Sequence, residues 1–423
     1  MTRADATWAE VPAGSPFPVG NLPYGVFVPG AAGPRIGPGI GARIGEAVLD
    51  LRAAEEAGLV DAGGTLRAGV LNDLMALGRP AWTVLRRRLT ELLTDPAYAG
   101  QVRPLLRPVA EVTMRLPFEV ADYVDFYSSR EHAENLGRLL RPGTEPLLPN
   151  WRHLPVGYHG RAGTVVVSGT PVVRPCGQLG PAGGRPGNPG PTYGPSSRLD
   201  IEAEVGFVVG VPSPLGGQVA TADFAAHVFG VVLVNDWSAR DIQAWEYQPL
   251  GPFLGKSFAT SISPWVVPLD ALAAARVEGP AQHPPVLPYL ARAEPWGLDL
   301  TLEVALNGTA VARPPFRGLY WTPDQQLAHL TVNGAAVRTG DLFASGTVSG
   351  PAREERGSMV ELAWNGAEPI TLPDGSTRAF LADGDTVSIT ATAPGVDGGR
   401  IGLGEVVGTI EPARCLGCQG RES

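Results

Sequence analysis

Polar and charged side chains recur at regular intervals in residues 235–258. Asp236, Arg240, Gln243 and Tyr247 are separated by four, three and four positions. On a helix this spacing would place all four side chains on one face. A carboxylate, a guanidinium, an amide and a phenol together are too polar for a core. The pattern therefore predicts one wall of an active site.

The sole lysine of the chain, Lys256, lies near the end of this stretch, whereas the other 32 basic residues are arginines. A compact ammonium suits a site that requires a point charge and not a forked guanidinium. Chance survival of one lysine is the alternative. The segment 251–257 resembles a phosphate-binding loop, but only three residues separate its glycines where that motif requires four. We therefore reject a phosphate-binding loop.

Two further carboxylates, Glu202 and Glu204, lie two positions apart in a segment that reads as a strand. Since side chains alternate along a strand, both point to one side. A solvent-exposed face is one interpretation. The apolar residues 205–209 favour a buried strand, in which a cation would relieve the repulsion between the carboxylates. Asp125 and Asp236 could complete an all-oxygen set, which suits Ca²⁺ or Mg²⁺.

A candidate general base is His132. Ser128 and Glu131 form a capping-box pattern, which predicts a helix that starts near Ser128, ends around residues 141–143 and carries His132 in its first turns. Asp125 and Tyr127 would lie on the preceding loop. Proximity to a candidate metal ligand favours a base over a structural histidine.

A general base needs a partner that orients its ring. Glu361 lies among apolar residues on an expected strand, where a buried carboxylate is costly unless it has a partner. His153 and His159 are weaker alternatives to His132, because no candidate ligand lies so near them. The segment 346–350 is not the Gly-x-Ser-x-Gly elbow of hydrolases. It reads as a tight turn whose Thr347 hydroxyl could hold a ligand carboxylate.

Strands should position most of these groups. Gly and Pro number 55 and 42, which indicates many turns between short strands. We expect an α+β, predominantly β fold. Strands are expected at 164–169, 200–209, 262–269, 298–311, 359–364 and 386–392, with loops at 176–197 and 271–297.

The first part of the chain has a different pattern. Residues 15–60 read as short strands of a small barrel. A helix follows with Pro80 near its start, and its apolar face comprises Trp82, Leu85, Leu89, Leu92 and Leu93. The three prolines of residues 103–117 suggest the crossing into a second domain. We therefore predict an N-terminal domain at 1–118 and a catalytic domain at 119–423.

Composition excludes several classes of protein. A hydrophobic content of 44% fits a globular chain, and the scattered basic residues at a net charge of −9 argue against nucleic-acid binding. Three cysteines are too few for a disulfide framework. Cys415 and Cys418 could form half a zinc site or belong to a frayed tail. No export signal or membrane-length apolar run is visible, so a soluble cytoplasmic protein is expected.

Longer stretches resemble the fumarylacetoacetate hydrolase family. They cover nearly the whole second part of the chain, and the first part has the length of the family's small domain. The stretches are DYVDFYSSREHAENLG, LLPNWRHLPVGYHGRAGTVVVSGT, LDIEAEVGF, NDWSARDIQAWEYQPLGPFLGKSFATSISPWVVP, GDLFASGTVSG and GSMVELAW.

The resemblance implies an SH3-like barrel before a mixed β-sandwich roll, and a homodimer. It implies Ca²⁺ or Mg²⁺ held by Asp125, Glu202, Glu204 and Asp236, and a second cation near Asp236, Lys256 and Thr260. It implies that His132 activates water, that Glu361 orients His132, and that Arg240, Gln243 and Lys256 stabilise the oxyanion and the carbanion leaving group. It assigns substrate binding to Tyr127, Arg141, Tyr158, Gln243, Tyr247 and Thr347. One departure from the family pattern is Ala259, where the family has glycine.

The implied reaction is hydrolysis of the carbon–carbon bond of a β-diketone, 4-fumarylacetoacetate, to fumarate and acetoacetate, the last step of tyrosine and phenylalanine breakdown. A poor nucleophile and a poor leaving group explain the need for a base, a Lewis acid and cationic donors. The alternatives are a hydrolase, decarboxylase or isomerase acting on acylpyruvates, and a non-catalytic binding protein on the same fold. The intact DFYSSREH segment favours the first reading, and the retained His132 and carboxylates disfavour the last.

Overall fold

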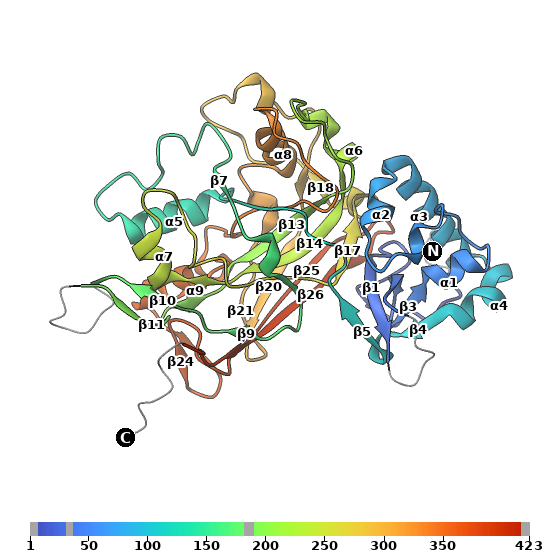
Figure 1. Ribbon diagram of the computed structural model, residues 1–423, viewed down its shortest axis with the longest axis horizontal. Helices are drawn as coiled ribbons and strands as arrows, with labels where there is room; N and C mark the ends of the chain where they lie inside the picture. The colour runs from blue at the N-terminus through green and yellow to red at the C-terminus, as the bar shows by residue number, and fades with distance from the viewer. Residues whose placement is uncertain (1–6, 31–36, 182–189, 416–423) are drawn as a thin grey trace.

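The computed structural model describes residues 7–30, 37–181 and 190–415. These residues form a strand-rich mixed α/β fold, in which the N-terminal part, drawn in blue, lies against one end of a large sheet (Figure 1). The expectation of a predominantly β architecture with helices is thus confirmed at this level.

The N-terminal strands form an antiparallel array in the order β4-β3-β2-β1, with β5 on the other edge of β1. This confirms short strands near residues 15–60. The segment 103–117 contributes β4 and β5 to this array, and β5 pairs with β1. The strands are β1 (Tyr24–Pro29), β2 (Gly39–Ile44), β3 (Ala47–Asp50), β4 (Leu106–Pro108) and β5 (Val112–Arg115).

Four helices accompany these strands: α1 (Leu51–Glu56), α2 (Asn72–Ala76), α3 (Arg79–Thr94) and α4 (Ala99–Val102). The longest, α3, has proline in its first turn, as predicted. It buries the expected apolar face, which comprises Trp82, Leu85, Leu89, Leu92 and Leu93. The helical period of these residues was sufficient to place the helix.

The array continues through β1 into the large sheet, in the order β1-β17-β14-β13-β22-β6-β7. Strands from both parts of the chain therefore share one sheet. Beyond this path, β16 pairs with both β14 and β8. The strands are β6 (Tyr123–Phe126), β7 (Gly157–His159), β8 (Val165–Val167), β13 (Ala203–Val209), β14 (Val228–Asp236), β16 (Thr260–Ile262), β17 (Trp265–Pro268) and β22 (Leu342–Ala344).

A second sheet runs in the order β21-β20-β25-β26-β9. Along β25 buried and half-buried residues alternate, so one face of the sheet is covered. Its buried residues share one apolar core with those of β13 and β14, which places the two sheets face to face. The strands are β9 (Val172–Val173), β20 (Thr301–Leu306), β21 (Thr309–Ala312), β25 (Thr386–Pro394) and β26 (Arg400–Glu411).

The central strand β14 is buried along its whole length. Val231 and Leu233 pack into the core between the two sheets, whereas Val232 and Val234 pack into the core shared with the N-terminal part. A strand buried on both faces reads as a continuous apolar run. Asp236 is the last residue of this strand and lies just past the end of its apolar run.

Small two-stranded sheets and the remaining helices complete the described chain. The strands are β10 (Cys176–Leu179) with β11 (Thr192–Pro195), β12 (Leu199–Asp200) with β15 (Ser238–Ala239), β18 (Arg276–Val277) with β19 (Gly297–Leu298), and β23 (Ile370–Thr371) with β24 (Thr377–Arg378). The helices are α5 (Arg130–Leu140), α6 (Phe224–His227), α7 (Arg240–Glu246), α8 (Pro323–Thr331) and α9 (Met359–Leu362).

Several local expectations were wrong. The segment 176–197, read as a loop, contains the β10–β11 hairpin. The segment 271–297, also read as a loop, contains short 3₁₀ helices and β18. Residues 359–364, expected as a strand, begin with the helix α9, because short apolar runs do not distinguish the two structures.

Cysteine chemistry also differed from expectation. Cys176 and Cys415 form a disulfide with a Cα–Cα distance of 5.7 Å, and 239 positions separate them. Cys415 is therefore neither a zinc ligand nor part of a frayed tail, whereas Cys418 lies outside the described residues. Within the described ranges, no helix combines the length and apolar character needed to cross a membrane.

Candidate active site

Four buried carboxylates converge at the ends of neighbouring strands. One oxygen from each of Asp125, Glu202, Glu204 and Asp236 lies within 4.8 Å of the others. Because directly paired residues of a sheet point to the same side, strand register explains this arrangement. Glu204 pairs with Val234, two positions before Asp236, and Asp125 lies on β6 two strands away. The sequence-based prediction that these groups meet is confirmed.

The position of Asp125 differs in detail from the expectation. We placed it on a loop, but it is the third residue of β6, and its backbone pairs with Ala344 of β22. Tyr127 follows directly after the strand, as expected of a residue between the strand and α5.

The electrostatics of the cluster fit a cation. Burial raises the pKa of Asp125 well above its usual range, and Asp236 raises it further. Burial and the neighbouring Asp125 do the same to the pKa of Glu204. Within the described residues, Asp125 Oδ1 and both carboxylate oxygens of Glu204 are buried without a hydrogen-bond donor. Such orphaned oxygens are costly unless something positive binds them, so the donor set fits a hard divalent ion.

Lys256 forms one wall of the acidic cluster. Its ammonium forms ion pairs with Glu202 Oε2 and, at 2.8 Å, with Asp236 Oδ2. Burial alone would lower the pKa of Lys256, but Asp236 and Glu202 outweigh it and raise the pKa well above its usual range. The lysine is thus fully charged. Thr260 donates to Asp236 Oδ1 at 2.8 Å, so Lys256 and Thr260, the other two residues expected around a second cation, both contact Asp236.

The expected single helical face is only partly correct. The helix α7 spans Arg240–Glu246, with Tyr247 as its C-terminal cap, whereas Asp236 ends the strand β14. β15 and its pairing with β12 separate the two elements. The four residues therefore come from a strand end, a helix and a helix cap, although Asp236 and Arg240 still contribute to one site.

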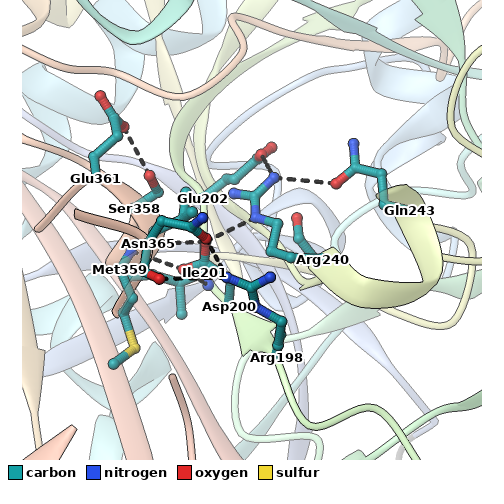
Figure 2. Close-up of polar contacts among 12 residues, drawn as sticks. Arg198, Asp200, Ile201, Glu202, Arg240, Gln243, Ser358, Met359, Glu361 and Asn365 are labelled. Atoms are coloured by element: carbon teal, nitrogen blue, oxygen red, sulfur yellow. Dashed lines mark hydrogen bonds and ion pairs between the residues drawn. The ribbon is translucent and has the colours of Figure 1, made fainter. Parts of the chain in front are cut away.

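Arg240 is buried at the start of α7 between acidic groups. Its Nη1 donates to Gln243 Oε1 at 3.2 Å and pairs with Glu202 Oε1 at 2.8 Å, while Nε donates to Asp200 Oδ2 at 2.8 Å (Figure 2). Burial works to lower the pKa of Arg240, but Asp200 and Glu202 raise it well above its usual range. Its Nη2 is buried without a partner among the described residues, so the two N–H groups of Nη2 remain for a ligand.

Glu202 connects the arginine, the lysine and the metal cluster. Burial would raise its pKa, but Lys256, Arg240 and His132 lie close enough to hold the pKa well below its usual range. Glu202 is therefore ionised, while the neighbouring Glu204 favours its neutral form without a metal. A bound divalent cation would favour ionisation of both carboxylates.

His132 and Glu361 form the pair expected from the sequence. His132 Nδ1 lies 2.6 Å from Glu361 Oε2, and both side chains are buried. The Glu361 carboxylate also accepts from Asn135 Nδ2 at 2.9 Å, Ser349 Oγ at 2.9 Å and Ser358 Oγ at 2.7 Å. Burial would raise the pKa of Glu361, but His132, Asn135 and Ser358 outweigh it and lower the pKa. An ionised carboxylate on Nδ1 fixes the tautomer that leaves Nε2 free to accept a proton.

The helix that carries His132 begins one residue later than predicted. Ser129, not Ser128, is its N-cap, and the Ser129 hydroxyl accepts the His132 backbone N–H at 3.4 Å. The predicted end is correct, because Arg141 is the C-cap. The Tyr127 ring packs edge-on against the His132 ring with centroids 5.2 Å apart. Packing and capping thus hold the imidazole in place.

The remaining expected substrate residues occupy different environments. The Tyr158 hydroxyl donates to Asp236 Oδ2 at 3.0 Å, and Thr347 Oγ1 is buried without a partner among the described residues. Arg141 donates to the Pro146 carbonyl at 2.8 Å. The Tyr247 hydroxyl accepts a hydrogen bond from Gln248 Nε2 at 3.0 Å, and Gln248 is not a member of the acidic cluster.

The two alternative histidines lie outside the buried centre. His153 is exposed, and the side chain of His159 is 74% exposed and 4.0 Å from Asp122. Both therefore lack the buried carboxylate partner that His132 has. His159 does line a cavity of about 330 Å³, which also borders Tyr158, Asp236, Lys256 and Thr260. This cavity gives solvent-side access to the lysine end of the cluster.

The sequence analysis missed four residues that bind charged groups of the site. Asp200 accepts a hydrogen bond from Arg240, and Glu361 accepts hydrogen bonds from Asn135, Ser349 and Ser358. For Asp200 a signal existed, because Asp200, Glu202 and Glu204 follow at intervals of two. The two serines carry no such signal, because their contact with Glu361 depends on how the chain folds around that residue.

Two family models match the chain. The fumarylacetoacetate hydrolase C-terminal model covers residues 122–411, and the fumarylacetoacetase N-terminal model covers residues 20–117. The chain belongs to the fumarylacetoacetate hydrolase family. The expected resemblance is thus confirmed over both parts of the chain.

Curated relatives agree with this family assignment. The chain is 48% identical to fumarylacetoacetase of Homo sapiens over 414 residues, which covers 94% of this chain and 97% of that relative. It is 44% identical to fumarylacetoacetase of Arabidopsis thaliana over 425 residues, covering 96% and 98%. Among solved structures, the fumarylacetoacetate hydrolase of Exiguobacterium antarcticum aligns with a TM-score of 0.54 at 16% identity, covering 93% of this chain and 100% of that chain. This last likeness supports the fold.

Proposed function

We propose that this protein hydrolyses the carbon–carbon bond of 4-fumarylacetoacetate and releases fumarate and acetoacetate. The observation that carries the proposal is the similarity, along nearly the full chain, to curated fumarylacetoacetases. The buried His132–Glu361 pair beside a four-carboxylate cluster supplies the chemistry that this reaction needs. The reaction belongs to the final stage of tyrosine and phenylalanine breakdown.

His132 is the proposed general base. With Nδ1 held by Glu361, its Nε2 can take a proton from water, and the resulting hydroxide adds to the carbonyl carbon of the fumaryl group. The buried carboxylate of Glu361 stabilises the imidazolium that forms. When the carbon–carbon bond breaks, its electron pair leaves with the acetoacetate part, which then accepts a proton.

Cationic side chains are placed to stabilise the negative charge that develops. Arg240 offers an unpartnered Nη2, and Lys256 is a buried ammonium beside the carboxylate cluster. Donors fixed before the reaction do not need to reorganise as charge develops, which favours the transition state. Gln243 contacts Arg240 and limits where the guanidinium can lie. We assign Tyr127, Arg141, Tyr158, Tyr247 and Thr347 to substrate binding on the basis of the family resemblance.

We assign Asp125, Glu202, Glu204 and Asp236 as the residues that would hold the metal. Ca²⁺ and Mg²⁺ fit the all-oxygen set, and either ion would supply Lewis-acid polarisation of the diketone oxygens. A second cation near Asp236, Lys256 and Thr260 is a further proposal. Ala259, which neighbours Thr260, is the departure from the family there.

Other features of the proposal rest on the family resemblance. They are an SH3-like barrel within an N-terminal domain at 1–118, a sandwich roll at 119–423, a homodimer and a cytoplasmic location. The antiparallel array β4-β3-β2-β1 with β5 supports the barrel, and the two facing sheets support the sandwich. The small anionic diketo acid fits the arginines of the site.

The test is an assay of the purified protein with added Ca²⁺ or Mg²⁺, following the loss of the ultraviolet absorption of fumarylacetoacetate. Acylpyruvates serve as comparison substrates. His132→Ala, prepared in the same way, controls for contaminating hydrolases and should be inactive while it still binds metal. Turnover of acylpyruvates in preference to fumarylacetoacetate would overturn the proposed substrate, and full activity of His132→Ala would overturn the proposed base.

A further inference from the structure

We propose that Asp200 is a positioning residue that holds two halves of the catalytic site in register, namely Arg240 on α7 and Glu361 on α9. The inference rests on the proposed function for its kinetic test. Asp200 lies on β12, is completely buried and is not one of the four carboxylates of the metal cluster. It therefore acts through other residues and does not contact the reacting atoms.

Asp200 receives four hydrogen bonds, three from α7 and α9 and one from the adjacent residue Ile201 (Figure 2). Oδ1 accepts the backbone N–H groups of Ile201 and Met359, both at 2.7 Å. Oδ2 accepts Arg240 Nε at 2.8 Å and the backbone N–H of Val360 at 3.1 Å. Both oxygens are thus engaged. Each of them binds the start of α9, and Oδ2 also binds Arg240 of α7.

The helix α9 needs this external support. It spans only four residues, Met359–Leu362, so its own hydrogen bonds cannot fix its position. Its N-cap residue, Ser358, accepts no capping hydrogen bond from the helix, and the Ser358 hydroxyl donates to Glu361 Oε2. The Asp200 carboxylate replaces the cap and binds the first two backbone N–H groups, where a negative charge is favoured.

Asp200 also fixes the orientation of the Arg240 guanidinium, through its Oδ2 atom. With Nε held by Asp200 and Nη1 held by Glu202 and Gln243, the plane of Arg240 has one orientation. This leaves Nη2 as the free donor. Asp200 therefore sets the separation between the donor that meets the developing charge and the helix that orients His132. An error of about 1 Å in such a separation costs roughly 10²-fold in rate.

Asparagine is the informative substitution because it retains the shape of aspartate but can accept with only one of its two terminal atoms. If its amide nitrogen occupies the Oδ2 position, it faces the Arg240 and Val360 donors. If it occupies the Oδ1 position, it faces the Ile201 and Met359 donors. In either orientation the amide N–H groups of asparagine oppose N–H donors of the site, and Arg240 or α9 is displaced.

We expect Asp200→Asn to lower kcat by about 10- to 10³-fold, on the scale of losing one fixed donor, while KM changes less than about threefold and metal content stays constant. Asp385→Asn is the matched control. Asp385 is also buried and accepts from a guanidinium, Arg378, at 2.8 Å and from a backbone N–H, but it lies outside the site. This variant should lose stability and keep kcat.

A double-mutant cycle separates positioning from general destabilisation. In an Arg240→Gln background, Asp200→Asn should cost much less in kcat than it does alone, since part of its effect passes through the arginine. A crystal structure of Asp200→Asn should show Arg240 or α9 displaced. Unchanged positions together with a kcat within twofold of the parent would overturn the proposal. A decrease in kcat no larger than that of Asp385→Asn would overturn it too.

These outcomes are distinct from failure of the proposed function. If the parent protein hydrolyses an acylpyruvate and not fumarylacetoacetate, the proposed substrate is wrong, and the same kcat comparison is then made with the acylpyruvate. If the parent turns over neither substrate, the crystal structure of Asp200→Asn decides the inference alone.

Discussion

Replacing Glu361 with glutamine tests the chemistry of the site most directly, because it removes one charge and keeps the shape of the side chain. In the native structure the Glu361 Oε2 position receives His132 Nδ1, Ser349 Oγ and Ser358 Oγ, and Oε1 receives Asn135 Nδ2. The amide of glutamine must place its nitrogen at one of these two positions.

The hydrogen-bond partners favour one of the two orientations. An amide nitrogen at the Oε1 position would oppose the Nδ2 group of Asn135, whose Oδ1 already accepts from Arg138. At the Oε2 position, the nitrogen can donate to hydroxyls that rotate and to a deprotonated His132 Nδ1. The substitution therefore stabilises the tautomer protonated at Nε2, which cannot act as the base.

The expected loss in kcat is about 10³- to 10⁴-fold, the scale found when the carboxylate of a Ser-His-Asp triad becomes an amide. This corresponds to about 4–5.5 kcal/mol in the activation free energy. Metal content should be unchanged, because Glu361 is not part of the carboxylate cluster.

The measurement is kcat from the loss of substrate absorption at saturating metal, with circular dichroism and metal analysis of the same samples. Glu303→Gln, which alters an exposed carboxylate paired with Arg313, is the control and should keep full kcat. If Glu361→Gln retained kcat within about tenfold of the parent, the tautomer argument would be refuted.

Three further predictions concern the metal, the lysine and stability. Glu202→Gln should lower the metal content measured by elemental analysis, because it removes one ligand charge; an unchanged content would remove Glu202 from the ligand set. Lys256→Arg should reduce kcat at least tenfold although it keeps the charge, since a guanidinium does not fit between Glu202 and Asp236; full activity would mean that the lone lysine is accidental. Burial raises the pKa of Asp324 to about 6, so this group favours folding below about pH 4, and its contribution is lost as the pH rises towards 6. Asp324→Asn should therefore raise the free energy of unfolding at pH 8 by up to about 3 kcal/mol, with a smaller gain at pH 5; denaturant unfolding at both pH values checks this, and an equal gain at both would contradict it.

Periodicity in the sequence was sufficient for elements stabilised by their own pattern. The face from Trp82 to Leu93 specified α3, and the interval of two correctly brought Glu202 and Glu204 together, although Glu202 lies just before β13. In these cases the signal is local, because 3.6-residue and two-residue repeats follow from the geometry of one element.

Short elements were less predictable. Asp236 and Arg240 have helical spacing, but Asp236 ends a strand that is buried on both faces, and burial decided its structure. Residues 359–362 form a helix partly because Asp200, from a distant strand, caps it. Neither burial nor a remote cap is visible in a window of a few residues.

The sequence by itself determined which chemical groups are present, that is, the carboxylates, the histidine base and the single lysine, and local patterns paired some of them. Only the tertiary structure decided which partners they have. His132 and Glu361 are 229 positions apart, and the Cys176–Cys415 disulfide spans 239. Such contacts arise from the packing of two sheets and from strand register, so their energies depend on the whole fold. Folding thus turns a set of costly buried charges into a site in which each charge has a partner or a place for a ligand.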